Sequence, residues 1–254
     1  MKTKLIIQLF LISVIVTACT FNNPEILLNE DFSTLPHGPL GTDVGAHTEY
    51  HYIAEARSQT RWAVSTFRYN LPPSWEIRKH GSGQMLVQNA VNPNKHWHPM
   101  VVTGSEFWNN YSVEVTFKPE DLKRRNGLVF RYQNDRQYYF AGIENDSVKI
   151  IKDNDGKAFQ IPDETVLAAD AYNGDSAENI KIRVEIAEDE INCKVNDKLE
   201  LNAKDGTFKN GKVALLSDSP ANFYSVIIST DSNDFEKHKN KVKKVCNYSG
   251  FINC

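Results

Sequence analysis

The chain has 254 residues, of which 41% are hydrophobic and 24% are charged, and its formal net charge is −3. This length fits one sizeable domain of sandwich or barrel type. The mixed signs and weak negative balance exclude a nucleic-acid partner and broad binding to anionic surfaces, so we expect function to come from a local site.

The amino terminus has the pattern of an export signal. Lys2 and Lys4 precede an apolar run over residues 5–16, which is too short to span a hydrocarbon core that needs roughly 20 residues. The Val-Thr-Ala-Cys that ends at Cys19 resembles the bacterial lipobox, which implies cleavage before Cys19 and lipid attachment there. An ordinary secretory signal is the alternative. Thr20 is not the aspartate expected of inner-membrane retention, which favours a lipid-anchored envelope protein at the outer membrane, on its periplasmic or surface face.

Four segments are expected along the chain. A signal peptide covers 1–18, a tether 19–25, a β-sandwich domain 26–230, and a basic tail 231–254. The first strand is expected over 26–32. The stretch 34–61 is rich in Gly, Pro, His and Tyr, and loops of this length in compact domains are usually functional or disordered. Its aromatic and histidine content argues against disorder. The lysines of the tail indicate a solvated appendage.

Strands follow one another at close spacing from Arg61 onward. Residues 180–186 alternate apolar and charged side chains, and residues 111–117 repeat this period of two, which gives one buried and one solvated face. The other expected strands are 75–79, 85–88, 128–132, 138–143, 148–152, 212–217 and 223–229.

Turn signals separate these strands. Asn-Asp at 145–146 and 196–197, Asp155-Gly156 and Asn210-Gly211 are predicted hairpin-type turns, because these residues tolerate positive φ. No long amphipathic helix is expected to interrupt them. The fold class is therefore all-β, with two antiparallel sheets packed face to face.

The remaining cysteines have separate expectations. Cys193 lies in an alternating segment that points it inward with two aliphatic neighbours, which predicts a buried, inert thiol. Cys246 and Cys254 are close together in a chain expected to be exported, so we predict that they form a disulfide. The alternatives are two thiols in a disordered tail or bridges to another protein.

Four short motifs occur in a characteristic order, namely 107–115 (Phe-Trp-Asn-Asn-Tyr-Ser-Val-Glu-Val), 126–132 (Asn-Gly-Leu-Val-Phe-Arg-Tyr), 138–140 (Tyr-Tyr-Phe) and 211–215 (Gly-Lys-Val-Ala-Leu). This order resembles the concanavalin A-like, or laminin G-like, jelly-roll superfamily, especially its glycan-associated bacterial branch related to the 3-keto-disaccharide hydrolase domain. The resemblance implies a two-sheet antiparallel jelly-roll sandwich. The superfamily holds sugar-binding modules, glycoside hydrolases, polysaccharide lyases and adhesive modules, so the fold alone does not choose a function.

The sequence argues against one enzymatic branch of this superfamily. Laminarinase-type glucanases carry Glu-x-Asp-x-x-Glu on one strand, which aims two carboxylates at one face. The nearest match here starts at Glu144 but has Lys149 in place of the second glutamate, and it falls on a predicted turn.

Two histidine clusters are candidate sites. His47, Glu49 and His51 would point one way from an extended segment, and they could bind a metal such as zinc or supply a general base and its orienting group. The alternative is a polar loop that packs its tyrosines on the sheet. In the second cluster, Trp97 could stack on a sugar ring while His98 bonds its hydroxyls, or Trp97 could be a core residue.

A third candidate is the segment 131–139. If Leu128 and Phe130 face the core, Arg131 lies on the other sheet face and could pair with a sugar carboxylate beside Tyr139, with Arg136 nearby. A solvated hairpin is the alternative.

Calcium signals are weak. The segment 153–156 (Asp-Asn-Asp-Gly) lacks a downstream glutamate and is more simply a tight turn. Glu30 and Asp31 could help a structural calcium, and no other cofactor is expected.

The leading hypothesis is a lipid-anchored protein that binds a glycan, expected to be acidic, on one sheet face. Its candidate binding residues are His47, His51, Trp97, His98, Arg131, Arg136 and Tyr139. The rival is a glycoside hydrolase or polysaccharide lyase of the same fold, with His47, Glu49 or His98 as acid or base. An adhesive or structural envelope protein is the third hypothesis.

Overall fold

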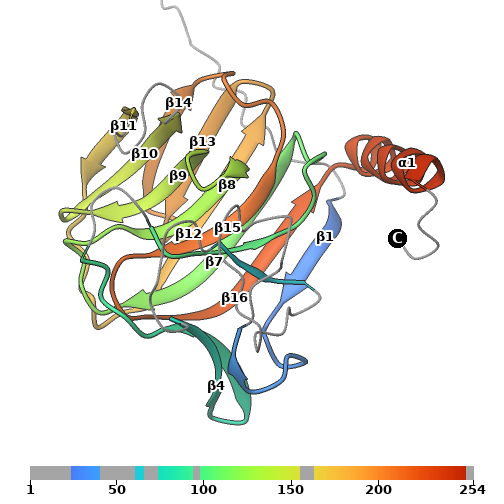
Figure 1. Ribbon diagram of the computed structural model, residues 1–254. Coiled ribbons are helices and arrows are strands. Elements are labelled where there is room, and N and C mark those ends of the chain that lie inside the picture. Colours follow the sequence, from blue (N-terminus) through green and yellow to red (C-terminus); the bar gives the residue numbers. More distant parts are fainter. Residues whose placement is uncertain (1–23, 41–60, 66–73, 94–97, 155–162, 250–254) are drawn as a thin grey trace, which may run out of the picture.

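The computed structural model describes residues 24–40, 61–65, 74–93, 98–154 and 163–249. Two antiparallel sheets pack as the layers of a sandwich, and one helix projects from the side (Figure 1). This confirms the predicted all-β, two-sheet architecture, and each sheet buries its inward face against the other.

The larger sheet has nine strands. In order across it lie β14 (Leu199–Lys204), β13 (Glu190–Val195), β12 (Ile180–Ala187), β7 (Tyr111–Pro119), β16 (Ala221–Thr230), β5 (Gly83–Gln88), β4 (Trp75–His80) and β2 (Gly38–Pro39), while β1 (Glu25–Glu30) also pairs with β16. The smaller sheet has seven strands, in the order β11 (Glu164–Ala171), β10 (Ser147–Asn154), β9 (Gln137–Glu144), β8 (Asn126–Asn134), β15 (Lys212–Ser217), β6 (Met100–Thr103) and β3 (Ala63–Ser65).

The core between the sheets follows from the alternation in the sequence. Val113 of β7 lies opposite Val184 of β12, and both are fully buried. The apolar residues of β12 at positions 180, 182, 184 and 186 are all buried, whereas Lys181 and Arg183 between them keep partial exposure. Removing this apolar surface from water is the main stabilising contribution of the sandwich.

The outer face of the seven-stranded sheet is also buried, although an antiparallel sheet commonly has one face in solvent. It carries a second apolar cluster made of Met100, Val102, Val129, Tyr132, Tyr138, Phe140, Ile151, Ala214 and Leu216. All of these side chains are at most 3% exposed. Polar groups at one edge of this face build the candidate site below.

The predicted strands are confirmed, and so are two of the four predicted turns. Asn145-Asp146 and Asn196-Asp197 have positive φ and join paired strands. Asn210-Gly211 is not a hairpin, because it leads from β14 in one sheet to β15 in the other. Asp155-Gly156 lies outside the described residues.

The tail contains a helix that the sequence analysis did not predict. α1 covers Ser232–Ser249, where a solvated appendage was expected. Asp231 accepts a hydrogen bond from the backbone N–H of Asp234 at 2.8 Å, as a helix N-cap does. Within the described part of the chain, no helix is long and apolar enough to cross a membrane.

Cys193 lies on β13 (Glu190–Val195), in the core between the sheets. Cys193 is fully buried and free, as predicted, and burial raises the pKa of its thiol to about 12. Cys254 and the side chain of Cys246 lie outside the described residues, so their pairing stays a prediction, as does lipidation of Cys19.

Candidate functional site

Charged side chains gather at one edge of the outer face of the seven-stranded sheet. We call the group formed by His98, Arg125, Glu144, Glu164 and Asp218 the Arg125 cluster. Arg125 precedes β8, Glu144 ends β9, and Glu164 begins β11. His98 and Asp218 flank β6 and β15 respectively. Strand pairing therefore brings together residues that are up to 120 positions apart in the sequence.

Arg125 is the centre of the cluster and its side chain is only 4% exposed. Its Nη1 and Nη2 donate to the two carboxylate oxygens of Glu164 at 2.5 and 3.0 Å, which is the bidentate geometry. Its Nε donates to Glu144 Oε1 at 3.1 Å. The guanidinium also lies over the Phe140 ring, 5.3 Å from the centroid. The arginine is thus held on both edges and on one face.

The contacts of His98 define its tautomer. Arg125 Nη1 donates to His98 Nε2 at 3.2 Å, so Nε2 carries the lone pair, and Nδ1–H donates to Asp218 at 2.8 Å. Asp218 also accepts a hydrogen bond from the Asn92 amide at 2.7 Å. Both ring nitrogens of His98 are therefore engaged, and neither is free to take a proton from a ligand.

The two glutamates of the cluster are held ionised. Burial alone would raise the pKa of the Glu164 carboxyl, but the hydrogen bonds from Arg125 outweigh it and lower that pKa below its ordinary value. The same balance lowers the pKa of Glu144, with Lys149 adding a 2.8 Å hydrogen bond. At neutral pH these two glutamates are hydrogen-bond acceptors and not proton donors.

A cavity of about 490 Å³ opens on the cluster. This volume lies within the ~300–1,000 Å³ usual for small-molecule sites. Besides the cluster it is lined by Asp121, Lys123, Arg124 and Asn145. Its wall is strongly polar, with carboxylate acceptors beside guanidinium and amide donors, and suits a ligand with many hydroxyl groups.

Among the described candidates, His98 alone lines this cavity. Arg131 does not lie on the outer face, so the predicted orientation is wrong. A bulge in the pairing of β8 with β9 and a positive φ of 48° at Arg131 reverse the alternation there. Its side chain is 1% exposed and donates to the carbonyl oxygens of Phe208, Asn109 and Glu188. Arg131 thus joins three loops.

Tyr139 and Arg136 are also away from the cavity. Tyr139 is buried between the sheets, stacked on Phe130 at 5.3 Å, and its hydroxyl donates to Asp205 at 2.5 Å. Arg136 lies in the turn between β8 and β9, at the far end of β8 and on the order of 25 Å from Arg125. The expectation that Arg131, Arg136 and Tyr139 would gather with His98 is therefore wrong.

The other candidates, His47, Glu49, His51 and Trp97, lie outside the described residues, so their roles stay predictions. Arg125, Glu164 and Asp218 were not predicted from the sequence as site residues. Glu144 was considered only for a glucanase motif. The pair Arg124-Arg125 before a predicted strand was the one sequence signal for this site. Neighbouring residues of an extended chain point to opposite sides, so one of the two arginines was bound to lie against the sheet.

The weak calcium signal at Glu30 has another explanation. One carboxylate oxygen accepts the backbone N–H of Phe32 at 2.8 Å and the other accepts the indole N–H of Trp62 at 3.1 Å. Asp31 Oδ1 likewise accepts a hydrogen bond from the backbone N–H of Ser33. Within the described ranges, no group of three or more His, Cys, Asp or Glu side chains is placed to hold a metal ion.

Comparison with solved structures places this architecture among known folds. A xylan β-1,4-xylosidase from Bacillus halodurans C-125 matches 80% of this chain over 39% of its own length, with 14% identity and a TM-score of 0.51. A Bacteroides ovatus GH16 protein of a mixed-linkage glucan locus, solved with the product G4G4G3G, matches 80% of this chain over its full length, with 11% identity and a TM-score of 0.50. The fold is a concanavalin A-like jelly roll.

The carbohydrate-binding module CBM66 from Bacillus subtilis is also similar, with 18% identity over 62% of this chain, 96% of the module and a TM-score of 0.49. No protein-family model matches the chain, and no curated protein matches it. These identities establish the fold alone, and the hydrolase branch suggested by sequence stays a prediction.

Proposed function

We propose that this jelly roll is a glycan-binding protein and that the cavity at the Arg125 cluster receives the sugar. The observation that carries the proposal is a polar cavity of about 490 Å³ in which ionised carboxylates and a fixed guanidinium stand side by side. Carboxylates accept hydrogen bonds from adjacent sugar hydroxyls, and arginine and asparagine donate to the same oxygens. Trp97, which precedes His98 in the chain, is the proposed stacking platform.

Binding fits the cluster better than hydrolysis does. Glycoside hydrolysis by two carboxyl groups needs one that is protonated at the working pH. The pKa values of Glu144 and Glu164 are both lowered, and His98 has no free nitrogen. Glu144, Glu164 and His98 are thus not placed as the proton donor that hydrolysis requires, which supports recognition without turnover.

The charge of the cavity favours a neutral glycan. The expected preference for an acidic sugar depended on Arg131, whose Nη1 and Nη2 donate to backbone carbonyls of three loops. The cavity wall itself carries Asp121, Glu144, Glu164 and Asp218 against three basic residues. A uronate would meet these carboxylates at close range, which is unfavourable.

Titration against oligosaccharides tests the proposal. The panel contains β-1,4-linked xylose and mixed-linkage glucose oligomers, chosen from the proteins of similar fold, and matched uronate-containing oligomers. We expect a neutral oligomer to bind and Glu164→Gln to weaken it about tenfold, because a charged hydrogen bond contributes roughly 1.5–3 kcal/mol.

Glu114→Gln is the matched control, since Glu114 lies on β7 in the other sheet and should bind like the unchanged protein. No binding across the panel would remove the proposal. Release of reducing sugar or of an unsaturated product would replace it with the hydrolase or lyase hypothesis.

We also propose that the mature protein is anchored by lipid at Cys19 in the cell envelope. The support is the basic start, apolar run and Val-Thr-Ala-Cys of residues 1–19. Metabolic labelling with a fatty acid should mark the protein, and Cys19→Ser should abolish the label. A labelled Cys19→Ser variant would contradict this anchor.

A further inference from the structure

A basic helix lies beside the strand with which the sandwich begins. α1 contains five lysines and two acidic residues over Ser232–Ser249. Lys237 and Lys239 have side chains that are 58% and 51% exposed, although they pair with Asp234 and Glu236. Lys241 is exposed as well, and Lys243 and Lys244 follow in the sequence. The whole chain is weakly acidic, so this helix is a local concentration of positive charge.

α1 is amphipathic, and its apolar side is turned to the sandwich. Phe235, His238 and Val242 recur at spacings of three and four, which places them on one side. His238 packs on the Trp108 ring at 5.8 Å and its Nε2 accepts the indole N–H at 2.8 Å. Lys237 is next to His238 in the sequence and therefore points to a different side of α1, whereas Lys241 follows His238 by three positions and flanks this contact.

Further contacts hold α1 next to β1. Asn110 donates to Asp234 at 3.0 Å, and Ser232 donates to Glu25 at 3.3 Å. Figure 1 shows the helix projecting from the side of the sandwich where β1 runs. The basic helix thus has a fixed position relative to the strand that begins the domain.

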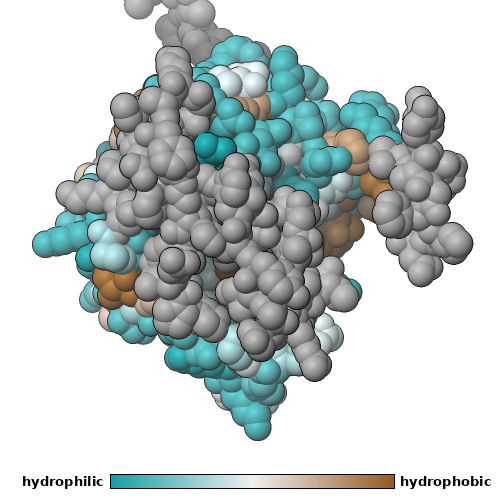
Figure 2. Space-filling model, in the orientation of Figure 1, coloured by the Kyte–Doolittle hydropathy of each residue, from teal (hydrophilic) through white to brown (hydrophobic). Residues whose placement is uncertain are grey.

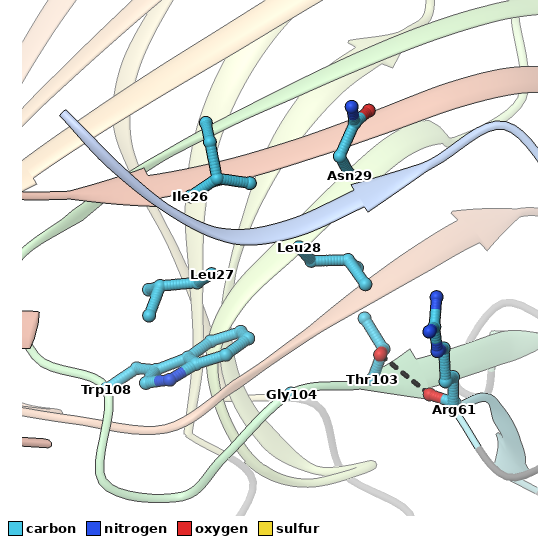
Figure 3. A pocket seen from close by; sticks show the side chains of 8 residues that line it. All are labelled: Ile26, Leu27, Leu28, Asn29, Arg61, Thr103, Gly104 and Trp108. Atoms are coloured by element: carbon cyan, nitrogen blue, oxygen red, sulfur yellow. Dashed lines mark hydrogen bonds between the residues drawn. The ribbon is translucent and has the colours of Figure 1, made fainter. Parts of the chain in front are cut away.

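An apolar surface adjoins the helix. In Figure 3, Leu27 lies next to the Trp108 ring and Leu28 points to the same side of β1 near Thr103, in the lining of a cavity of about 470 Å³, whereas the Ile26 side chain points to the other side of the strand. Ile26 is 53% exposed and adds an apolar side chain to this surface. Figure 2 shows hydrophobic surface where α1 meets the sandwich. Positive charge and exposed apolar side chains are the two features of a surface that rests on a lipid interface.

Chain length brings this surface to a membrane if Cys19 is lipidated. Glu25 follows Cys19 by six positions, so even a fully extended tether would span only roughly 20 Å. α1 itself is about 27 Å long. A membrane that holds Cys19 is therefore within reach of the helix, and one acyl-modified cysteine plus a basic surface is an established combination for stable attachment.

We propose that the lysines of α1 and the exposed edge of β1 form a membrane-docking surface for anionic lipid headgroups. The proposal rests on the lipid anchoring proposed above. Docking would orient the sandwich on the membrane, with its seven-stranded sheet and the Arg125 cluster in a fixed direction. An acidic protein partner is the competing occupant of the same lysines.

Vesicle binding by the mature chain with Cys19→Ser tests the surface without the anchor. We expect this protein to co-sediment with phosphatidylcholine vesicles that contain about 30% phosphatidylglycerol, and not with phosphatidylcholine alone. Lys237→Gln, Lys239→Gln and Lys241→Gln together should weaken binding at least tenfold, since each lysine near the surface contributes roughly a fivefold factor. Binding should also weaken at high salt.

A second triple variant is the matched control. Lys181→Gln, Lys194→Gln and Lys198→Gln remove the same charge at the ends of β12, β13 and β14 that lie away from the turn at Glu188 and Asp189, where Asn110 joins α1. This variant should bind vesicles like the parent. Equal loss in both variants, or no preference for phosphatidylglycerol, would overturn the docking surface. The fatty-acid label on Cys19 is measured separately, so either proposal can fail alone.

Discussion

Arg131 has a structural role that alternation could not reveal. Leu128 and Phe130 face the core as predicted, and a regular strand would have turned Arg131 outward. The positive φ at Arg131 instead directs its guanidinium to three loop carbonyls. An alternating pattern predicts side-chain orientation only where strand pairing is regular, and the sequence does not reveal a β-bulge.

Replacing Arg131 with methionine tests this role. Arg131→Met should lower the free energy of unfolding by about 3 kcal/mol, because it leaves buried carbonyl oxygens without donors. Chemical denaturation measures the change, with Arg78→Met as a control at a side chain that is 49% exposed. Unchanged stability combined with lost sugar binding would instead support the original ligand-binding role.

Cys193 offers a second test at the residue scale. With a thiol pKa raised to about 12 by burial, it should not react with a thiol reagent at pH 8 until the protein unfolds. The measurement is made on a chain with Cys19→Ser, Cys246→Ser and Cys254→Ser, so that Cys193 is the one thiol present. Rapid reaction of the folded protein would contradict the buried position.

Element by element, the sequence predicted the strands that have one buried face. β12 was evident because four aliphatic residues alternate with charged ones. β11 was missed because its side chains are exposed or only half-buried, so no apolar period marks it. The Arg125 cluster was missed for a different reason: its members come from five separate segments, and only strand pairing brings them together.

The packing of α1 against the sandwich should depend on pH. His238 Nε2 accepts a hydrogen bond from Trp108, which requires the neutral ring. Burial and the charge of Lys241 lower the pKa of His238. This histidine is therefore protonated more readily when α1 is detached from the sandwich than when α1 is packed against it. The contact between α1 and the sandwich is therefore strongest above the ordinary histidine pKa of about 6.5, and it weakens as pH falls through the lowered pKa of His238.

Hydrogen exchange of α1 at pH 7.5 and pH 5, corrected for intrinsic rates, measures this effect. Asp234 stays ionised over this range, because Lys237 and Asn110 outweigh burial and lower its pKa. His238→Phe keeps a ring on Trp108 but cannot titrate, so its exchange should not change with pH. The same pH effect in both proteins would assign the titration to another group.

At the scale of the whole molecule, the two faces of the sandwich have different roles in this account. The nine-stranded sheet carries β1 and also α1, which follows β16 directly in the chain, and these form the surface proposed to meet the membrane. The seven-stranded sheet carries the Arg125 cluster on its outer face. The division follows from strand order, because β1 pairs with β16 of the larger sheet and Arg125 precedes β8 of the smaller one.

The central claim is that a sugar binds at the Arg125 cluster, and hydrogen exchange with a bound oligosaccharide tests it most directly. We predict slower exchange in the segments around Arg125, Glu144 and Glu164, with no change in β12, β13 and β14 of the other sheet. Protection confined to the nine-stranded sheet, or none with any oligosaccharide at saturating concentration, would contradict the account.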